Sequence, residues 1–278
     1  MLTLAYLPVV AFVIVVSCEL FWPRRIDTRN DVHRWLSNLV LYMTNKLGSR
    51  GIYLLLFAAG MELNEAQSAT DDGLLKAASI TLAVVVLFDV VDYGKHVLLH
   101  RVPFLWGFHQ VHHSDSKLDF TSQFRFHPFE MLLSMSLDVS LILLLDIPVY
   151  AITVIALIGL TWGMFQHANT HAFQGLDRYA RFLLITPNLH HIHHYTDTAA
   201  ANKNFGVMFS VWDRLFGSYL SPERLSADAP QYGVLGLNDR GNLNPFDLLI
   251  LPFQALNKEA QVALDRDQTP IKTVDEKS

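Results

Sequence analysis

The sequence has 278 residues, of which 51% are hydrophobic and 17% charged, and its formal net charge is −5 at pH 7. This negative balance argues against a nucleic-acid partner, because such partners are bound through basic surfaces. The single cysteine, Cys18, excludes a disulfide framework, a cysteine-ligated zinc site and a cysteine-ligated iron–sulfur cluster, so any metal has to be bound by histidine or carboxylate.

The hydrophobic residues are concentrated in long runs, which predicts an integral membrane protein. The first run, residues 2–22, is long enough to span a bilayer with some tilt. A cleaved signal peptide is the alternative, but the basic cluster that begins at Arg24 follows the run, so we expect a retained span with its N-terminus outside. A second run, residues 35–61, contains Lys46 and Arg50 and either spans the membrane or begins as an interfacial helix.

The loops and runs that follow predict a topology. The loop 62–73 is acidic and contains no Lys or Arg, so it is expected outside, because basic residues favour the cytoplasmic side. The third run, 74–91, continues without a helix breaker to His96, which would then emerge on the cytoplasmic face. Two further apolar segments, 131–146 and 149–165, predict a hairpin that enters from that face and returns to it.

Eleven of the thirteen histidines fall in two blocks, residues 96–113 and 167–194. In each block an H-x-x-x-H pair is followed by an H-x-x-H-H triplet. Residues three and four apart share one helix face, with Cβ atoms about 5–6 Å apart, and neutral imidazole is the commonest metal ligand. Scattered core or surface histidines would not repeat these spacings. The predicted metal ligands and catalytic residues are His96, His100, His109, His112, His113, His167, His171, His190, His193 and His194.

Three further residues are candidates for supporting these ligands. A metal-bound histidine usually donates its other ring N–H to a carboxylate or a carbonyl. Asp92 and Asp89 lie four and seven residues before His96, on its side of the expected helix, so they are predicted partners. The alternative is that both are ordinary polar residues at a helix end. His191 occupies an x position of the last triplet, so it is left out as a ligand and kept as a candidate partner.

These motifs resemble those of the fatty acid hydroxylase / sterol desaturase superfamily, whose members are membrane di-iron oxygenases with histidine boxes. The likeness covers about residues 80–220. The flanking segments that strengthen it are 92–100, 106–109, 125–128, 186–190 and 212–217. The resemblance implies an enzyme with two iron ions that uses O₂ and two electrons to hydroxylate or desaturate a lipid, whether fatty acyl, sterol-like or alkylglycerol. Imidazole also suits zinc, so ligand type alone does not select the metal.

The same resemblance sets expectations for architecture and partners. We expect an all-α integral membrane protein, a helical bundle of about four to five spans with a cytoplasmic histidine-rich metal-binding cap, in the bacterial inner membrane. Its expected parts are 1–79 (N-terminal membrane helices and outer loop), 80–220 (the histidine-box core) and 221–278 (C-terminal loop, interfacial segment and tail). No haem, flavin or ferredoxin module is recognised, so electrons are expected from a separate donor protein.

Two functions of other classes compete with this one. A histidine-rich metal-binding or transport protein would spread ligands across the bilayer, whereas the histidines here gather at one predicted face. A haem-binding electron carrier needs histidine pairs on facing helices within spans and does not account for H-x-x-H-H. The histidine boxes do not choose between hydroxylation, desaturation and ether cleavage.

Overall fold

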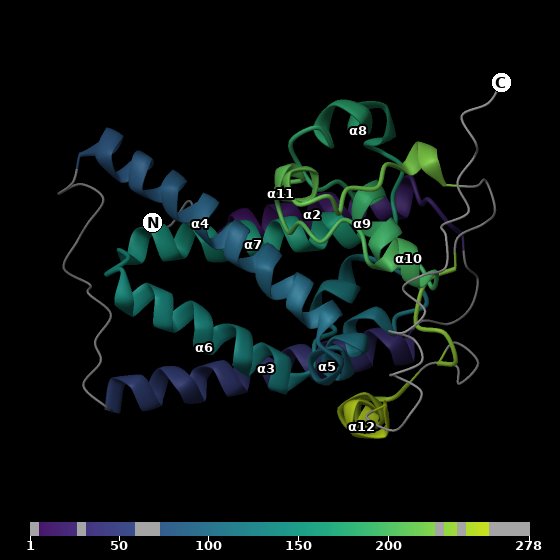
Figure 1. The fold of residues 1–278 in the computed structure, drawn as a ribbon, viewed down its shortest axis with the longest axis horizontal. Helices are drawn as coiled ribbons and strands as arrows, with labels where there is room; N and C mark the ends of the chain where they lie inside the picture. Colours follow the sequence, from purple (N-terminus) through teal and green to yellow (C-terminus); the bar gives the residue numbers. More distant parts are fainter. Residues whose placement is uncertain (1–5, 27–31, 59–72, 226–230, 238–242, 256–278) are drawn as a thin grey trace.

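The computed structural model describes residues 6–26, 32–58, 73–225, 231–237 and 243–255, and within these ranges the protein is built from helices without a β-strand (Figure 1). The all-α prediction is confirmed for this part of the chain. Residues 62–72 of the acidic loop and the tail from residue 257 lie outside the described residues. The long helices are α2 (Leu7–Phe21), α3 (Val32–Ala58), α4 (Leu74–Arg101), α6 (Pro128–Leu144) and α7 (Val149–His167).

The shorter helices α5 and α8 to α12 lie toward one end of the long ones (Figure 1). This arrangement places α5 and α9, which carry histidines of the two blocks, at the same end of the molecule. The shorter elements are α5 (Pro103–His113), η1 (Phe120–Phe124), α8 (Gln174–Ala180), α9 (Pro187–His193), α10 (Thr198–Ala201), α11 (Val211–Leu215), η2 (Pro222–Arg224) and α12 (Pro245–Ala255).

Two of the long helices, α4 and α7, are long and apolar enough to cross a membrane, and α2 is a shorter apolar helix. Only 22% of the most apolar 18-residue window of α4 or α7 is buried within the protein, so most of that surface faces outward, as in a lipid-facing helix. The predicted total of four to five spans stays a prediction.

A proline separates α4 from α5 and turns the chain between the first two histidine motifs. Val102 adopts an extended conformation, with φ −96° and ψ 113°, as the residue before a proline favours. Pro103 then occupies the first turn of α5, where its missing N–H leaves no intrahelical bond unmade. The break allows α5 to fold back toward α4 and not continue its axis.

The helices α6 and α7 form the expected hairpin, with ends that differ by up to three residues from the apolar segments 131–146 and 149–165. The start of α6 is fixed by two local features. Pro128 lies in its first turn, and the side chain of His127 accepts a hydrogen bond from the backbone N–H of Phe129 at 3.1 Å. His127 is therefore a helix cap.

A buried ionic network ties α3 to the segment directly after α5. Arg34, which is 2% exposed, pairs with Asp115 at 2.8 Å and also with Asp119. Burial raises the pKa of Asp115, but the guanidinium groups of Arg34 and Arg125 outweigh burial and hold that pKa below its ordinary value. Because Asp115 lies two residues after the last histidine of α5, the network holds that end of the helix in place.

The C-terminal ends of α2 and α7 lie side by side. The carboxylate of Glu19 accepts a hydrogen bond from the backbone N–H of Asn169 at 2.8 Å, and the N–H of His171 donates to the carbonyl of Trp22 at 3.0 Å. Both helices therefore end at the same level, next to the short helices.

Candidate metal centre

The first histidine block folds so that two helices present their imidazoles to each other. His96 and His100 are one turn apart on α4, with ring centroids separated by 5.1 Å. On α5, His109 and His113 have the same spacing and face the first pair, at 5.0 Å between the rings of His96 and His109 and 4.8 Å between those of His100 and His113. The break between α4 and α5 makes this possible, because one continuous helix could not oppose its own residues.

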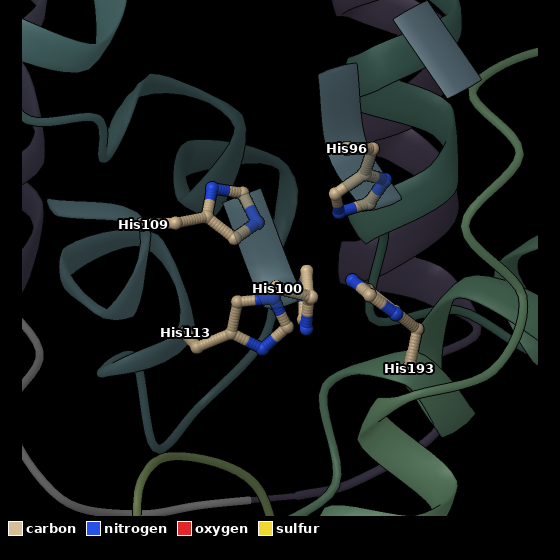
Figure 2. A group of neighbouring side chains, drawn as sticks. All are labelled: His96, His100, His109, His113 and His193. Atoms are coloured by element: carbon tan, nitrogen blue, oxygen red, sulfur yellow. The ribbon is translucent and has the colours of Figure 1, made fainter. Parts of the chain in front are cut away.

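The second block completes this group with one residue. His193, on α9, lies 4.5 Å from the ring of His96 and 4.6 Å from that of His100. One ligand atom from each of the five side chains lies within 4.8 Å of all the others, and the rings converge on one point (Figure 2). The Nε2 atoms of all five are buried and have no hydrogen-bond partner within the described structure. The five-histidine group consists of His96, His100, His109, His113 and His193.

A second group, the four-histidine group, lies beside the first and comprises His112, His167, His190 and His194. It joins α5, α7 and the helix α9 with its C-cap. The Nε2 atom of His167 lies 3.2 Å from that of His112 and 2.9 Å from that of His190, and the Nε2 atoms of His190 and His194 are 3.1 Å apart. When several nitrogens bind the same metal ion at about 2.0–2.1 Å, the distances between those nitrogens are similar to the ones found here.

Burial keeps these imidazoles in the form that binds metals. Burial first, and then the neighbouring histidines, hold the pKa values of His112, His113, His190 and His194 well below the usual 6.5. For His193 the same burial lowers the pKa to about 3. Metal binding requires a neutral imidazole with a free lone pair. The five-histidine group offers converging Nε2 atoms without a partner, and the Nε2 atoms of the four-histidine group converge on one another, so the neutral side chains fit two metal ions, one in each group.

The outer ring nitrogens of several ligands are held by partners from elsewhere in the fold. The Nδ1 atoms of His96, His167 and His193 lie 2.7, 2.7 and 2.9 Å from the backbone carbonyl oxygens of residues 205, 163 and 203. A carbonyl can only accept, so these contacts place the proton on Nδ1 and leave the Nε2 lone pair facing the centre.

One ligand has a carboxylate partner that sequence reasoning missed. The Nδ1 atom of His109 lies 2.8 Å from Oε1 of Glu130, a residue 5% exposed in the first turn of α6. The other oxygen, Oε2, is buried and has no hydrogen-bond partner within the described structure. The signal that could have found Glu130 was a charged residue at the very start of an apolar helix, but nothing in its spacing pointed to His109.

The structure does not bring His171 to the other nine predicted ligands. The second H-x-x-x-H pair was expected to lie on one helix face, but α7 ends at His167 and Ala168 leaves the helical conformation, with φ −57° and ψ 128°. His171 is exposed, and its Nδ1 lies 3.1 Å from the carbonyl oxygen of Pro23. The expectation of an i, i+4 pair is therefore wrong at this position.

The expected contacts of Asp92 and Asp89 with metal-binding histidines are not formed either. Asp92 pairs with Lys95 at 2.5 Å, and Lys95 also pairs with Asp138 at 2.7 Å. The nearby ammonium group thus takes the carboxylate that was expected to face a histidine. Asp89 accepts hydrogen bonds from the backbone N–H of Met208 at 2.7 Å and from residues 209 and 212, so it anchors a loop.

This loop carries two of the carbonyl groups that hold ligands. Asp213 accepts hydrogen bonds from the N–H groups of Phe205 and Gly206 at 2.8 and 2.9 Å. With Asp89, it fixes the segment that presents the carbonyls of residues 203 and 205 to His193 and His96. Asp89 and Asp213 therefore act on the candidate centre through the backbone of this loop.

His191 lies close to the centre without belonging to either group. It is fully buried, its Nε2 is 3.3 Å from the carbonyl oxygen of His167, and its Nδ1 is 3.2 Å from the hydroxyl of Tyr232. Leaving it out of the ligand set agrees with this position. It contacts the backbone carbonyl of His167 and not the ring of a candidate ligand, so its supporting role stays a prediction.

Comparisons with known proteins point in one direction. Residues 81–218 match the family model of fatty acid hydroxylases. An ornithine lipid hydroxylase of Rhizobium tropici is 32% identical over 152 residues, which are 54% of this chain and 44% of that protein. An alkylglycerol monooxygenase of Caenorhabditis elegans is 27% identical over 173 residues, covering 60% of this chain and 31% of that protein.

A third relative is cholesterol 25-hydroxylase of Mus musculus, 29% identical over 159 residues, with 55% of this chain and 52% of that protein covered. The matches thus cover about half or less of the length of these relatives. No solved structure matches the chain. All nine histidines of the two groups, and Glu130, lie within the matched residues 81–218.

Proposed function

Residues 81–218 belong to the fatty acid hydroxylase family, and from this we propose that the chain is a membrane-bound non-haem di-iron oxygenase that hydroxylates or desaturates a C–H bond of a lipid with O₂ and two electrons. The observation that supports this most directly is the pair of converging, buried histidine groups. The three relatives are named as two hydroxylases and a monooxygenase, and the substrates in their names are lipids.

In this proposal each histidine group holds one iron ion, and iron supplies the activation of O₂. The protein contributes position and environment. Carbonyl partners fix the ring orientations, and burial keeps bulk water away from the metal ligands. Imidazoles add no negative charge, so the carboxylate of Glu130, beside His109, is the nearby anionic group that offsets part of the ionic charge.

The position of the centre suits a lipid substrate. His96 and His100 lie toward the C-terminal end of α4, and His167 ends α7, so the two candidate spans both lead to the centre. We place the centre on the cytoplasmic face of the bacterial inner membrane, because the basic residues Arg24, Arg25 and Lys117 lie at this end. A lipid can then approach from the bilayer without crossing water.

Two electrons per turnover are proposed to come from a separate donor protein. The buried carboxylates and histidines described above contain no electron-transfer group of their own. The donor would dock at the short helices, which is the end of the molecule where the centre lies.

The decisive experiment is metal analysis of the purified chain together with an optical spectrum and an oxidation assay. We expect two iron ions per chain, no haem absorption band, and O₂-dependent oxidation of a lipid when reduced electron donor is supplied. Bound zinc with no O₂ consumption would favour the metal-binding or transport alternative. A haem band would favour the electron carrier, and either result would overturn the proposal.

A further inference from the structure

A cavity of about 370 Å³ lies between α2, α7, α8 and the start of α9. Its volume falls in the range of about 300–1,000 Å³ that is usual for small-molecule sites. None of the histidines of the two metal groups is among its lining residues. The cavity is thus a separate feature that shares two helices, α7 and α9, with the candidate metal centre.

The lining changes from apolar to polar along the cavity. Ala11 and Ile14 of α2 and Phe165 of α7 form the apolar part, within the apolar helices. Arg24 and Asn188, which are hydrogen-bonded to each other, lie at the other part, beyond the ends of these helices. Since α2 and α7 end at one level, the apolar part of the cavity lies at the level of the hydrocarbon core and the polar part at the membrane boundary. An amphiphilic lipid has the same orientation in a bilayer.

Three of the residues that line this cavity each carry a buried polar atom that has no hydrogen-bond partner within the described structure. They are Nε1 of Trp162, Oγ1 of Thr186 and Oδ1 of Asp177. A buried polar group without a partner destabilises the fold, so native proteins rarely keep several together. The other oxygen of Asp177 is paired with Arg181 at 3.3 Å, which leaves Oδ1 directed elsewhere. Together the three atoms offer two donors and one carboxyl acceptor.

We propose that this cavity binds one lipid molecule by its apolar chain and by a neutral polar group that both donates and accepts hydrogen bonds, a hydroxyl or an amide. The indole N–H of Trp162 and the hydroxyl of Thr186 donate to its oxygen, and Asp177 accepts its O–H or N–H. Arg24 also lines the cavity, but its guanidinium is already hydrogen-bonded to Asn188. A carboxylate or phosphate group suits the cavity less well, because it would face the carboxylate of Asp177, whose Oδ1 has no partner. That this lipid is the substrate rests on the proposed function. Thr186 is one helical turn before His190, so the lipid is held beside a metal-bearing helix.

The cavity is tested with a substitution on α2 that fills it. Ala11→Trp places a large ring among the lining residues, and Val13→Trp places the same ring at a position 56% exposed that does not line the cavity. The probe is radiolabelled hexadecylglycerol, measured by equilibrium binding to the iron-loaded protein in detergent. We expect A11W to weaken binding at least about tenfold, as overpacking of a filled site does, and V13W to leave it unchanged. Equal binding to A11W and wild type, or equal loss in A11W and V13W, would overturn the proposal.

The polar end is tested with a second variant and with probes of different head groups. Thr186→Val keeps the shape of the side chain and removes the hydroxyl, so hexadecylglycerol should bind about fivefold more weakly to it. For the wild type, hexadecylglycerol and palmitamide should bind more tightly than palmitate. Palmitate binding as tightly as either, or T186V binding hexadecylglycerol like wild type, would refute the assignment of the polar group.

Iron content and lipid oxidation are measured on the same samples, so that the two proposals fail separately. A11W should keep its iron, because no metal-binding histidine lines the cavity. Lipid binding that is sensitive to A11W in a protein that oxidises no lipid would reject the proposed function and retain the cavity as a lipid site. Oxidation of lipid by A11W with an unchanged KM would reject the cavity and retain the function.

Discussion

At the scale of single residues, the contact between Glu130 and His109 distinguishes one metal ligand from the others. Other ligands whose outer nitrogen has a partner in the structure use backbone carbonyls, which are neutral. A carboxylate at 2.8 Å holds the ring of His109 and also makes it a more basic ligand. Glu130 is therefore a positioning residue for the five-histidine group.

Replacing Glu130 tests this role. Glu130→Gln keeps the size of the side chain and removes its charge, so we expect a folded protein whose iron affinity falls by about 10–100-fold, as is typical when such a partner is lost. The measurement is iron retained per chain across a chelator titration, with the melting temperature as a check on folding. Asp92→Asn is the matched control, because Asp92 pairs with Lys95, and it should hold iron like wild type. Equal iron affinity in E130Q and wild type would contradict the assignment.

Nine of the ten predicted ligands belong to the two histidine groups, and His171 lies outside both. His190→Ala should remove one iron per chain and abolish turnover, because His190 lies at the middle of the close nitrogen contacts of the four-histidine group. His171→Ala should keep two iron ions per chain, because the side chain of His171 is exposed and lies outside both groups. Both variants are compared by metal analysis after identical purification. Loss of iron in H171A would show that the chain rearranges around the metal and would restore the tenth ligand.

At the scale of elements, the structure shows which parts of the site a sequence can predict. The five candidate ligands on α4 and α5 and the three on α9 and its C-cap were predictable, because helical spacing is a local property. The failure at His171 came from the end of α7, where the chain leaves the helix and pairs with the carbonyl of Trp22. Glu130 could not be assigned either, because its contact with His109 depends on how α6 packs against α5.

The fold was predictable to a similar extent. Apolar runs located α2, α6 and α7 and the start of α4 to within a few residues, since long hydrophobic segments are a strong signal. The run 74–91 ends ten residues before α4 does. The apolar runs did not show that Asp89 and Asp213 would fix the loop whose carbonyls contact two candidate ligands. The contact of Asp89 with this loop joins residues more than a hundred positions apart in the chain, so local sequence patterns do not reveal it.

This loop also contains a close approach that only glycine allows. A Cβ atom at Gly206 would lie 2.6 Å from the carbonyl oxygen of Phe209 and 2.8 Å from the side chain of Ile185. Gly206→Ala should therefore shift the loop, reduce stability by about 1–3 kcal/mol and weaken iron retention through the neighbouring carbonyl of Phe205. Thermal unfolding and iron content measure the two effects. Gly159→Ala, on α7 with open space around it, is the control and should show neither.

At the scale of the whole molecule, metal ions would join segments that are far apart in the chain. The ligands come from α4, α5, α7 and α9, and their unpartnered nitrogens leave the metal-free protein with buried, unsatisfied polar atoms. Removing iron with a chelator should lower the melting temperature strongly, since an ion present at 100 times its Kd stabilises by about 2.7 kcal/mol. Melting curves before and after chelation, and after iron is restored, give the measurement. An unchanged melting temperature in the fully demetallated protein would contradict a joining role.

The proposed orientation in the membrane is also testable on the whole chain. With Cys18 replaced by serine, a cysteine introduced at the exposed Arg224 should react with a membrane-impermeant thiol reagent in inside-out vesicles and not in intact cells, because the proposed orientation puts η2 and the candidate metal centre on the cytoplasmic side. The cysteine-free protein gives the background. Labelling in intact cells would place the centre on the opposite face.

The division of ligands between the two groups has a consequence for how the protein is made. Four of the five residues of one group lie between His96 and His113, whereas three of the four residues of the other belong to α7 and the α9 segment. Chains are synthesised from the N-terminus, so a nascent chain that has emerged only as far as α5 already carries most of one site and a single ligand of the other. The distribution implies an order of maturation, in which the five-histidine group can capture its ion during membrane insertion and the four-histidine group waits until the last histidines leave the ribosome.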